Sequence, residues 1–359
     1  MRTVIIDGQF GSTGKGALAG YLGQVNSPEI ISCAFSPNAG HTFARKDGFK
    51  MIHKMIPLGI TSPSLRAIVF GPGTLIDTDA FVHEVREAKL AGYLEDVSLL
   101  VHRNAALVLD RHRDAESEGG TAPGSTRKGC GEAQMERVKR NPTLNNTVAA
   151  NVCSDLVNPS FYGMIELVDT PYLQRVFRSL NVQIEGCQGY SLSVYHGTYP
   201  YCTYRDVSTH SLLADCGVPY DQVKGMTVWG CFRTYPIRVA NRPEDGEWSG
   251  PCYIDSTEIS FEDIGQKQEL TTVTKLPRRI FTFSHRQAKE ACLQNGIELS
   301  FLNFAQYCHS FSQLRQLVVD MEEYTKVALL GFGPKESDIF NFTTYKALKE
   351  QYERYHQHS

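Results

Sequence analysis

The sequence has no long run of apolar residues. No stretch approaches the ~18 consecutive uncharged apolar residues that a membrane-spanning helix needs. The first residues, 1–7, resemble a short strand and become charged too early for a secretory signal peptide. These absences predict a cytoplasmic protein with no membrane partner.

Positive charge is not in excess, and paired cysteines are missing. Lys and Arg total 36 against 39 Asp and Glu, so the formal net charge is −3. A protein dedicated to duplex binding usually carries a basic face, so we expect no nucleic-acid partner, while a local basic pocket for phosphates stays possible. The 10 cysteines form no CxxC pair. We therefore expect reduced, mostly buried thiols in a reducing compartment.

What is present is the pattern of an α/β protein. The 359 residues are 42% hydrophobic and 21% charged, with no repeat or low-complexity tract. Short apolar runs alternate with helical periodicity and glycine-rich turns. We predict an α/β fold, with one large mostly parallel sheet flanked by helices, long inserted loops and a single domain over 1–359. The expected strands are 4–6, 30–35, 66–70, 97–101, 182–184, 227–232, 237–239 and 327–330, and the expected helices are 17–22, 81–90 and 343–356.

Residues 8–16 form a glycine-rich turn between the first strand and the first helix. Four glycines and Lys15 fall within nine residues. Such a turn presents backbone N–H groups to an anion, and Lys15 adds charge. The turn departs from the standard P-loop because Gln9 stands for a glycine and Gly16 for Ser or Thr. A tight turn with a surface lysine is the plainer alternative, but the composition favours phosphate binding.

Three later segments carry polar groups suited to ligands. Residues 38–42 place His41 after the second strand, where either a catalytic or a structural histidine would fit. Residues 185–189 and 196–203 bring amides and hydroxyls to tight turns, which suit a base or a phosphate but are also ordinary turn chemistry. Residues 271–279 combine threonines with two arginines, which favours an anion clamp over a solvated loop.

Taken in order, these motifs resemble those of the adenylosuccinate synthetases. That family carries GQWGDEGKGK, NAGHT, GTTGRGIGP…R, EGAQG…HGTYPYVT, TTGRxRR, TKLD and a late STGP. Residues 38–42 are identical to the second motif, and 196–203 match at all but one position. The resemblance spans nearly the whole chain and implies the family's fold and a ligase that uses a nucleoside triphosphate.

The resemblance also implies roles for individual residues. The catalytic positions match Ser12, Lys15, His41 and Gln188, and Mg²⁺ would meet Ser12 and Gly40. Arg140 matches an arginine that the neighbouring subunit contributes, which implies a homodimer. The nucleoside monophosphate would contact Ser12, Asn38, Thr126, Arg140, Gln188 and Thr203, and L-aspartate would contact Thr271, Thr272, Val273, Thr274 and Arg278. The triphosphate would contact Thr13, Gly14, Lys15, Gly16, Gly40, His41, Thr42, Gln188, Arg279, Asn303, Gln306, Gly331, Gly333 and Pro334.

Departures from the family pattern concern the base that is recognised. Ser12 stands where the family has its aspartate general base, and Thr13 and Leu276 replace a glutamate and an arginine. These changes resemble a phage branch that joins aspartate to C6 of dGMP, for diaminopurine synthesis, in the host cytoplasm. A serine leaves room for the 2-amino group of guanine and can accept from it. The acceptor of the N1 proton stays open: water, the phosphate or the aspartate amine.

The segment that should recognise the triphosphate's base is also changed. The family's lysine and aspartate are replaced by Asn303 and Ala305. A methyl group cannot accept from guanine, so we expect ATP or dATP as the phosphate donor, with Asn303 near the adenine amine. Glu336 or Asp338 could instead supply the missing acceptor. An ordinary synthetase acting on IMP and a non-catalytic nucleotide-binding protein are the alternative functions.

Overall fold

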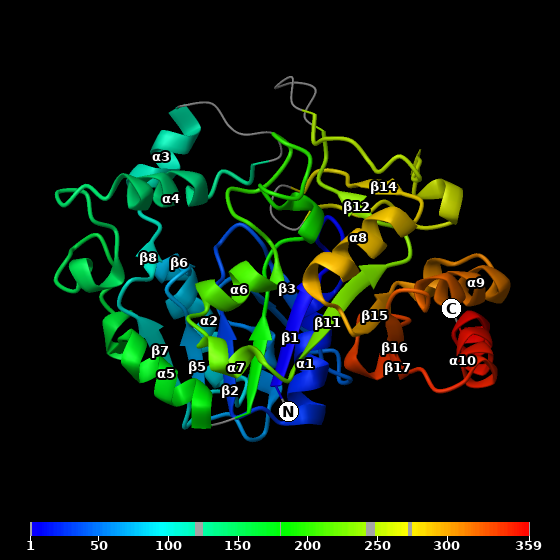
Figure 1. Cartoon of the computed structure of the whole chain (residues 1–359), viewed down its shortest axis with the longest axis horizontal. Coiled ribbons are helices and arrows are strands. Elements are labelled where there is room, and N and C mark those ends of the chain that lie inside the picture. Colours follow the sequence, from blue (N-terminus) through cyan, green and yellow to red (C-terminus); the bar gives the residue numbers. More distant parts are fainter. Residues whose placement is uncertain (1, 119–124, 180, 242–247, 272–274, 359) are drawn as a thin grey trace.

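The structure, a computed structural model, describes residues 2–118, 125–179, 181–241, 248–271 and 275–358. Its centre is a ten-stranded sheet of order β17-β16-β15-β11-β1-β10-β2-β5-β7-β9 (Figure 1). The strands of this sheet are β1 (Arg2–Asp7), β2 (Ile30–Cys33), β5 (Ala67–Phe70), β7 (Ser98–His102), β9 (Glu166–Val168), β10 (Val182–Glu185), β11 (Met226–Arg233), β15 (Leu299–Asn303), β16 (Lys326–Gly331) and β17 (Ile339–Asn341).

Every neighbouring pair in this sheet is parallel except β16 and β17. The central strands are nearly continuous apolar runs because helices cover both faces. Parallel strands end at one common edge, so the loops that follow β1, β2, β10, β11 and β15 are brought to the same side of the sheet.

The helices divide between the two faces of the sheet. One core cluster packs α1 and α2 against the sheet, and another packs α5, α6, α8, α9 and α10. Asp77 caps α2, and Ser208, Ser284 and Ser310 cap α6, α8 and α9, each accepting a backbone N–H of the first turn. The helices are α1 (Lys15–Asn26), α2 (Thr78–Leu90), α3 (Asp110–Glu118), α4 (Cys130–Lys139), α5 (Thr170–Ser179), α6 (Thr209–Asp215), α7 (Tyr220–Val223), α8 (His285–Asn295), α9 (Phe311–Met321) and α10 (Tyr345–His358).

Insertions beyond the carboxyl edge carry small sheets of their own. The pair α3 and α4 lies at the upper left of Figure 1, apart from β12 and β14 at the upper right. The small sheets consist of β3 (His41–Ala44) with β4 (Lys50–His53), β6 (Leu75–Ile76) with β8 (Ala106–Leu107), and β12 (Ile237–Arg238) with β14 (Arg279–Phe281) and β13 (Glu258–Ile259).

The fold class is confirmed, as are the strands and helices expected from apolar runs and periodicity. Among the described residues, no helix combines the length and apolar character needed to cross a bilayer. All ten cysteines are free, and seven of them are buried. Burial raises the pKa of Cys130 and Cys308 to about 12, which keeps these thiols protonated and unreactive.

Candidate active site

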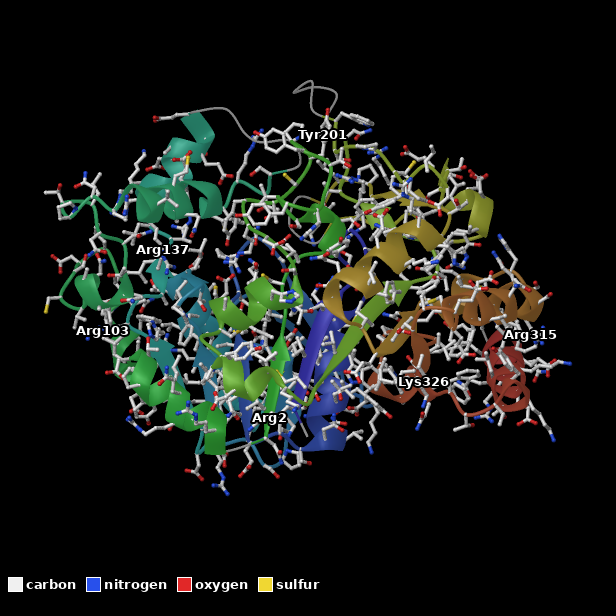
Figure 2. All side chains as sticks on the ribbon, viewed as in Figure 1. Arg2, Arg103, Arg137, Tyr201, Arg315 and Lys326 are labelled. Atoms are coloured by element: carbon white, nitrogen blue, oxygen red, sulfur yellow. The ribbon has the colours of Figure 1, made fainter. Side chains whose placement is uncertain are left out.

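A cavity of about 620 Å³ lies over the carboxyl edge of the sheet. Six adjacent strands end beneath it or lead into it, namely β16, β15, β11, β1, β10 and β2. In Figure 2, Arg2 at the start of β1 lies at the lower side, and Tyr201, which lines the cavity, lies at the upper side. The cavity therefore occupies the edge where open α/β sheets bind ligands.

The glycine-rich loop is shaped by Asp7, the last residue of β1. This buried carboxylate accepts the backbone N–H groups of Gln9 and Gly11, at 2.9 and 3.2 Å, and the hydroxyl of Thr13 at 2.5 Å. These bonds turn part of the loop inward toward the protein. The N-terminus of α1 follows directly, so its remaining backbone N–H groups face the cavity.

Lys15 is held between two segments. Its Nζ donates to Asp7 Oδ2 at 3.1 Å and to the backbone oxygen of Gln188 at 2.9 Å. Gln188 adopts a left-handed backbone with φ of 60°, and its side chain donates to Asn38 Oδ1 at 2.9 Å. The lysine, the amide and the asparagine thus form one connected group at the cavity wall.

His41 is oriented by a buried carboxylate. Its Nδ1 lies 2.6 Å from Glu185 Oε1, and its ring stacks on Phe35 with centroids 4.2 Å apart. The other oxygen of Glu185 accepts the backbone N–H of Leu58 at 2.8 Å. Because a carboxylate can only accept, Nδ1 carries the hydrogen and Nε2 is left for a ligand. His53 lies opposite His41 in the β3–β4 pair, where it is fully buried, and burial lowers its pKa to about 4.

Ser12 is joined to two arginines. Arg278 Nη1 donates to Ser12 Oγ at 2.6 Å, and Arg233 Nη1 lies 3.4 Å from the Ser12 backbone oxygen. Arg233 is fully buried, and its Nη2 forms a 2.6 Å ion pair with Glu269. Burial lowers the pKa of Arg278. Burial by itself would raise the pKa of Glu269. The charge and hydrogen bonds of Arg233, together with further donors, lower the pKa by more, so it lies below its usual range.

The segment after β15 shows how the expected base-recognition residues are placed. Asn303 lines the cavity, but its Nδ2 donates to the Thr13 oxygen at 3.1 Å and its Oδ1 accepts from Phe304 N at 2.9 Å. Ala305 is fully buried in the core and does not line the cavity. Gln306 lines the cavity, and its Oε1 is buried without a hydrogen-bond partner.

Two glycines make room for Asn303. A Cβ at Gly14 would lie 2.2 Å from Asn303 Nδ2, and one at Gly331 would lie 2.1 Å from Asn303 Oδ1. Gly331 therefore supports Asn303 from behind rather than lining the cavity. Glu336 accepts from Gln24 Nε2 at 2.6 Å, and Asp338 accepts from Lys335 N at 2.9 Å; neither lines the cavity.

Most of the residues predicted from the sequence meet in this cavity. Arg140 and Arg279 do not line it. Arg279 pairs with Glu258 at 2.6 Å, and Thr272, Val273 and Thr274 lie outside the described residues. The predicted residues that line the cavity are Ser12, Thr13, Gly14, Lys15, Gly16, Asn38, Gly40, His41, Thr42, Thr126, Gln188, Thr203, Thr271, Arg278, Asn303, Gln306, Gly333 and Pro334.

Seven charged residues of the site were not predicted from the sequence: Glu116, Lys128, Arg238 and Glu269 line the cavity, and Asp7, Glu185 and Arg233 hold residues that line it. Asp7, Glu185 and Arg233 each end a strand, and Glu269 precedes the threonine-rich segment. A charged residue at the end of a buried apolar strand is a usable signal for Asp7 and Glu185. The partners of Arg233 and Glu269 depend on the strand order, which the sequence does not give.

Arg140 lies in a second cavity, formed by α3, α4 and the segment after α4. Within it, Glu136 accepts from Arg111 at 2.7 Å and from His112 Nε2 at 3.0 Å. Arg140 ends α4 with a left-handed backbone, φ 52°. Figure 2 shows Arg137 of the same helix well to the left of Tyr201. Arg140 therefore lies apart from the first cavity of its own chain.

A parallel sheet whose carboxyl edge holds a glycine-rich loop, a lysine and a carboxylate-paired histidine defines an α/β nucleotide-binding site. The family profile of adenylosuccinate synthetase matches residues 4–151 and 163–320. The chain belongs to this family, whose members are ligases.

Two relatives come from phages. The N6-succino-2-amino-2'-deoxyadenylate synthase of Cyanophage S-2L is 52% identical over 354 residues, covering 98% of this chain and 96% of the relative. The synthase of the same name from Acinetobacter phage SH-Ab 15497 is 40% identical over 361 residues, covering 94% and 92%.

Solved structures agree on the fold. The Cyanophage S-2L succinoaminodeoxyadenylate synthetase, bound to dGMP and to dATP as an energy donor, superposes with a TM-score of 0.93 at 51% identity and covers 99% of both chains. The adenylosuccinate synthetase of Plasmodium falciparum gives a TM-score of 0.74 at 17% identity, covering 95% of this chain and 100% of that one, which is a likeness of fold alone.

Proposed function

We propose that this chain joins L-aspartate to C6 of dGMP at the expense of ATP or dATP. The products are N6-succino-2-amino-2'-deoxyadenylate, the nucleoside diphosphate and phosphate. The proposal is supported by the 52% identity to the Cyanophage S-2L synthase and by the likeness to its complex with dGMP and dATP.

The observation that carries the proposal is the placement of Ser12. Ser12 lines the same cavity as Lys15 and His41, and its hydroxyl is held by Arg278. A base whose N1 faces this position also brings C2 close to it. The small side chain leaves room for the 2-amino group of guanine, and the hydroxyl oxygen can accept a hydrogen bond from it.

The first step transfers the γ-phosphoryl group to O6 of guanine. Lys15 and the N–H groups at the start of α1 bind the transferring phosphoryl group. His41 would act here as the imidazolium, with one hydrogen on Nδ1 held by Glu185 and a second on Nε2, which it donates to the oxygen that leaves in the second step. The side chains of Gln188 and Asn38 hydrogen-bond to each other at the cavity wall, and we assign the positioning of the base to this fixed pair.

The second step is attack of the aspartate amine on C6. The C6–N bond forms as the C6–O bond breaks, and phosphate leaves. We assign the aspartate carboxylates to Arg278 and Thr271, which line the cavity beside Ser12. The segment 272–274, expected to complete this clamp, lies outside the described residues.

Magnesium fits this site only in the company of phosphates. In the described ranges, no three His, Cys, Asp or Glu side chains gather so that they could hold a metal ion by themselves. Gly40 exposes its backbone at the cavity wall, and the Ser12 hydroxyl is engaged by Arg278. The Gly40 carbonyl would help to hold Mg²⁺ beside the bound phosphates. The ion would neutralise charge on the triphosphate.

The working unit is proposed to be a homodimer of single-domain chains in the host cytoplasm. Strands from both ends of the sequence share one sheet, which supports a single domain. Arg140, which resembles a monophosphate-binding residue, lies outside its own chain's first cavity, which supports its insertion into a partner's site.

Phosphate release with aspartate and ATP tests the proposal. IMP, GMP and dGMP are each supplied as the acceptor. Release with dGMP but not IMP supports the proposed function. Release with IMP alone would indicate an ordinary synthetase, and no release with any acceptor would indicate a nucleotide-binding protein.

A further inference from the structure

When guanine is phosphorylated at O6, the proton on N1 must leave the ring. The Ser12 hydroxyl cannot accept and hold that proton. A serine hydroxyl has no accessible basic state near neutral pH, so a carboxylate is the simplest acceptor. Among the described residues that line the cavity, two are acidic, Glu116 and Glu269. Asp7 and Glu185 lie behind the wall, where Thr13, Lys15, His41 and backbone N–H groups occupy their oxygens.

Glu116 belongs to another part of the cavity. Its carboxylate accepts from the Ser125 hydroxyl at 2.6 Å and from the backbone N–H of Gly129. These contacts hold the segment that contains Thr126. Both oxygens of Glu116 are thereby committed to fixing that segment.

Glu269 lies on the Ser12 side. Arg233 Nη1 is 3.3 Å from Glu269 Oε2 and 3.4 Å from the Ser12 backbone oxygen, so one guanidinium nitrogen bridges the two residues. Glu269 Oε1 is well engaged, with Arg233 Nη2 at 2.6 Å and the Tyr307 hydroxyl at 3.1 Å. Oε2 has the longer contact and keeps lone pairs for another donor. The side chain is 23% exposed, so water can reach it.

We propose that Glu269 accepts the N1 proton of dGMP through one bridging water. The N1–H bond breaks, its electron pair forms the N1=C6 double bond, and O6 attacks the γ-phosphorus as the diphosphate leaves. The water takes the N1 proton and passes one of its own to Oε2. The neighbouring Arg233 and Arg278 keep Glu269 ionised beforehand, as a base must be. The inference rests on the proposed function.

The test uses Glu269→Gln in two backgrounds. Oxygen-18 scrambling between the β,γ-bridge and the β-nonbridge positions of ATP, without aspartate, reports the first step alone. We expect E269Q to slow dGMP-dependent scrambling by about a hundredfold or more, with dGMP binding retained. Ser12→Asp restores the carboxylate that the family carries in this loop, so Glu269 is no longer needed as the base. With IMP as the acceptor, S12D and S12D/E269Q should therefore scramble ATP oxygens at rates within about threefold of each other.

Three further measurements distinguish a role of Glu269 in proton transfer from a structural role in holding Arg233. Glu84→Gln neutralises a buried carboxylate that does not line the cavity and should stay near the wild-type rate, whereas Glu269→Asp should recover part of the rate that E269Q loses. Urea unfolding midpoints of E269Q and E269D show whether both fold alike. Any one of three results would overturn the inference. E269Q could lower the scrambling rate equally in the wild-type and S12D backgrounds, E269D could lower it as much as E269Q does, or E269Q could scramble at the wild-type rate. An inactive wild-type protein would instead refute the proposed function.

Discussion

Arg278 Nη1 donates to Ser12 Oγ across 2.6 Å, and this hydrogen bond joins the threonine-rich segment to the glycine-rich loop. A 2-amino group that reaches Ser12 must share the hydroxyl with Arg278. An aspartate carboxylate that binds Arg278 competes with the hydroxyl in turn. The sites that we propose for the monophosphate and for aspartate therefore meet at one side-chain contact.

Replacing Ser12 by aspartate should reverse the choice of purine. The carboxylate crowds the 2-amino group and pairs with Arg278, so we expect kcat/KM for dGMP to fall by about tenfold to a hundredfold and IMP to be preferred. Steady-state kinetics with both acceptors measures the change. Ser12→Ala is the control: it leaves the space and loses one hydrogen bond, for a cost of about 1 kcal/mol. Unchanged use of dGMP by S12D would rule out the steric explanation.

Replacing Glu185 by glutamine should lower kcat more than it raises KM. The substitution removes the negative charge that faces His41 Nδ1 while keeping the shape of the side chain. We expect about a tenfold to hundredfold loss in kcat. Glu84→Gln is a matched control, because Glu84 is also buried and accepts backbone N–H groups but, unlike Glu185, bonds to no residue that lines the cavity. Similar kcat values in both variants would contradict the role given to Glu185.

Glu84 should also give stability a measurable dependence on pH. Burial raises its pKa from 4.5 to about 7. The folded state therefore binds this proton more tightly than the unfolded state, so its contribution is fully present below pH 4.5 and is lost as the pH rises through about 7. Urea unfolding of wild type between pH 4.5 and 8 should show this decline, and E84Q should flatten it. A decline of the same size in E84Q would assign it to other groups.

Arg140→Ala should be rescued by mixing subunits. If Arg140 enters the partner's site, an R140A subunit paired with a Lys15→Ala subunit has one intact site. Random exchange of equal amounts should then restore about a quarter of wild-type activity, although each variant alone is inactive. Sedimentation at assay concentration checks the dimer. A fully active monomer, or a mixture without activity, would refute the shared site.

ATP should be a better phosphate donor than GTP. Asn303 and Gln306 line the cavity at and after the end of β15, and Pro334 lines it after β16; none of them is a carboxylate that could accept from guanine N1–H and its 2-amino group. Each buried unpaired donor costs ~1–3 kcal/mol, so we expect at least about a tenfold advantage for ATP in kcat/KM at fixed dGMP and aspartate. A clear preference for GTP would show that another acceptor serves the base.

The sequence predicted the fold and the residues that face the cavity, but not what holds them. Continuous apolar runs revealed β1, β2 and β5, and the run Val182-Gln183-Ile184 before a glycine-rich turn revealed β10, whereas β15 was not predicted. Lys15 and His41 stood in recognisable motifs. Asp7, the partner of Lys15, ends the strand that leads into the same loop, whereas Glu185, the partner of His41, ends β10 and comes within reach only through the strand order. Ala305 was expected beside a base, but it begins a short 3-10 helix after β15 and its side chain packs in the core.

The fit of Asn303 between Gly14 and Gly331 has a consequence for sequence change. A methyl group at either glycine overlaps the amide, so neither position tolerates alanine while asparagine stays. A smaller residue at 303 would remove the overlap with the amide and would also remove the bond to the Thr13 oxygen. It would still leave Gly14 with a φ of 99° and a Cβ at Gly331 only 2.9 Å from Phe301 Cζ. A library that randomises these positions one at a time should therefore recover glycine at 14 and 331, although the two lie in different motifs.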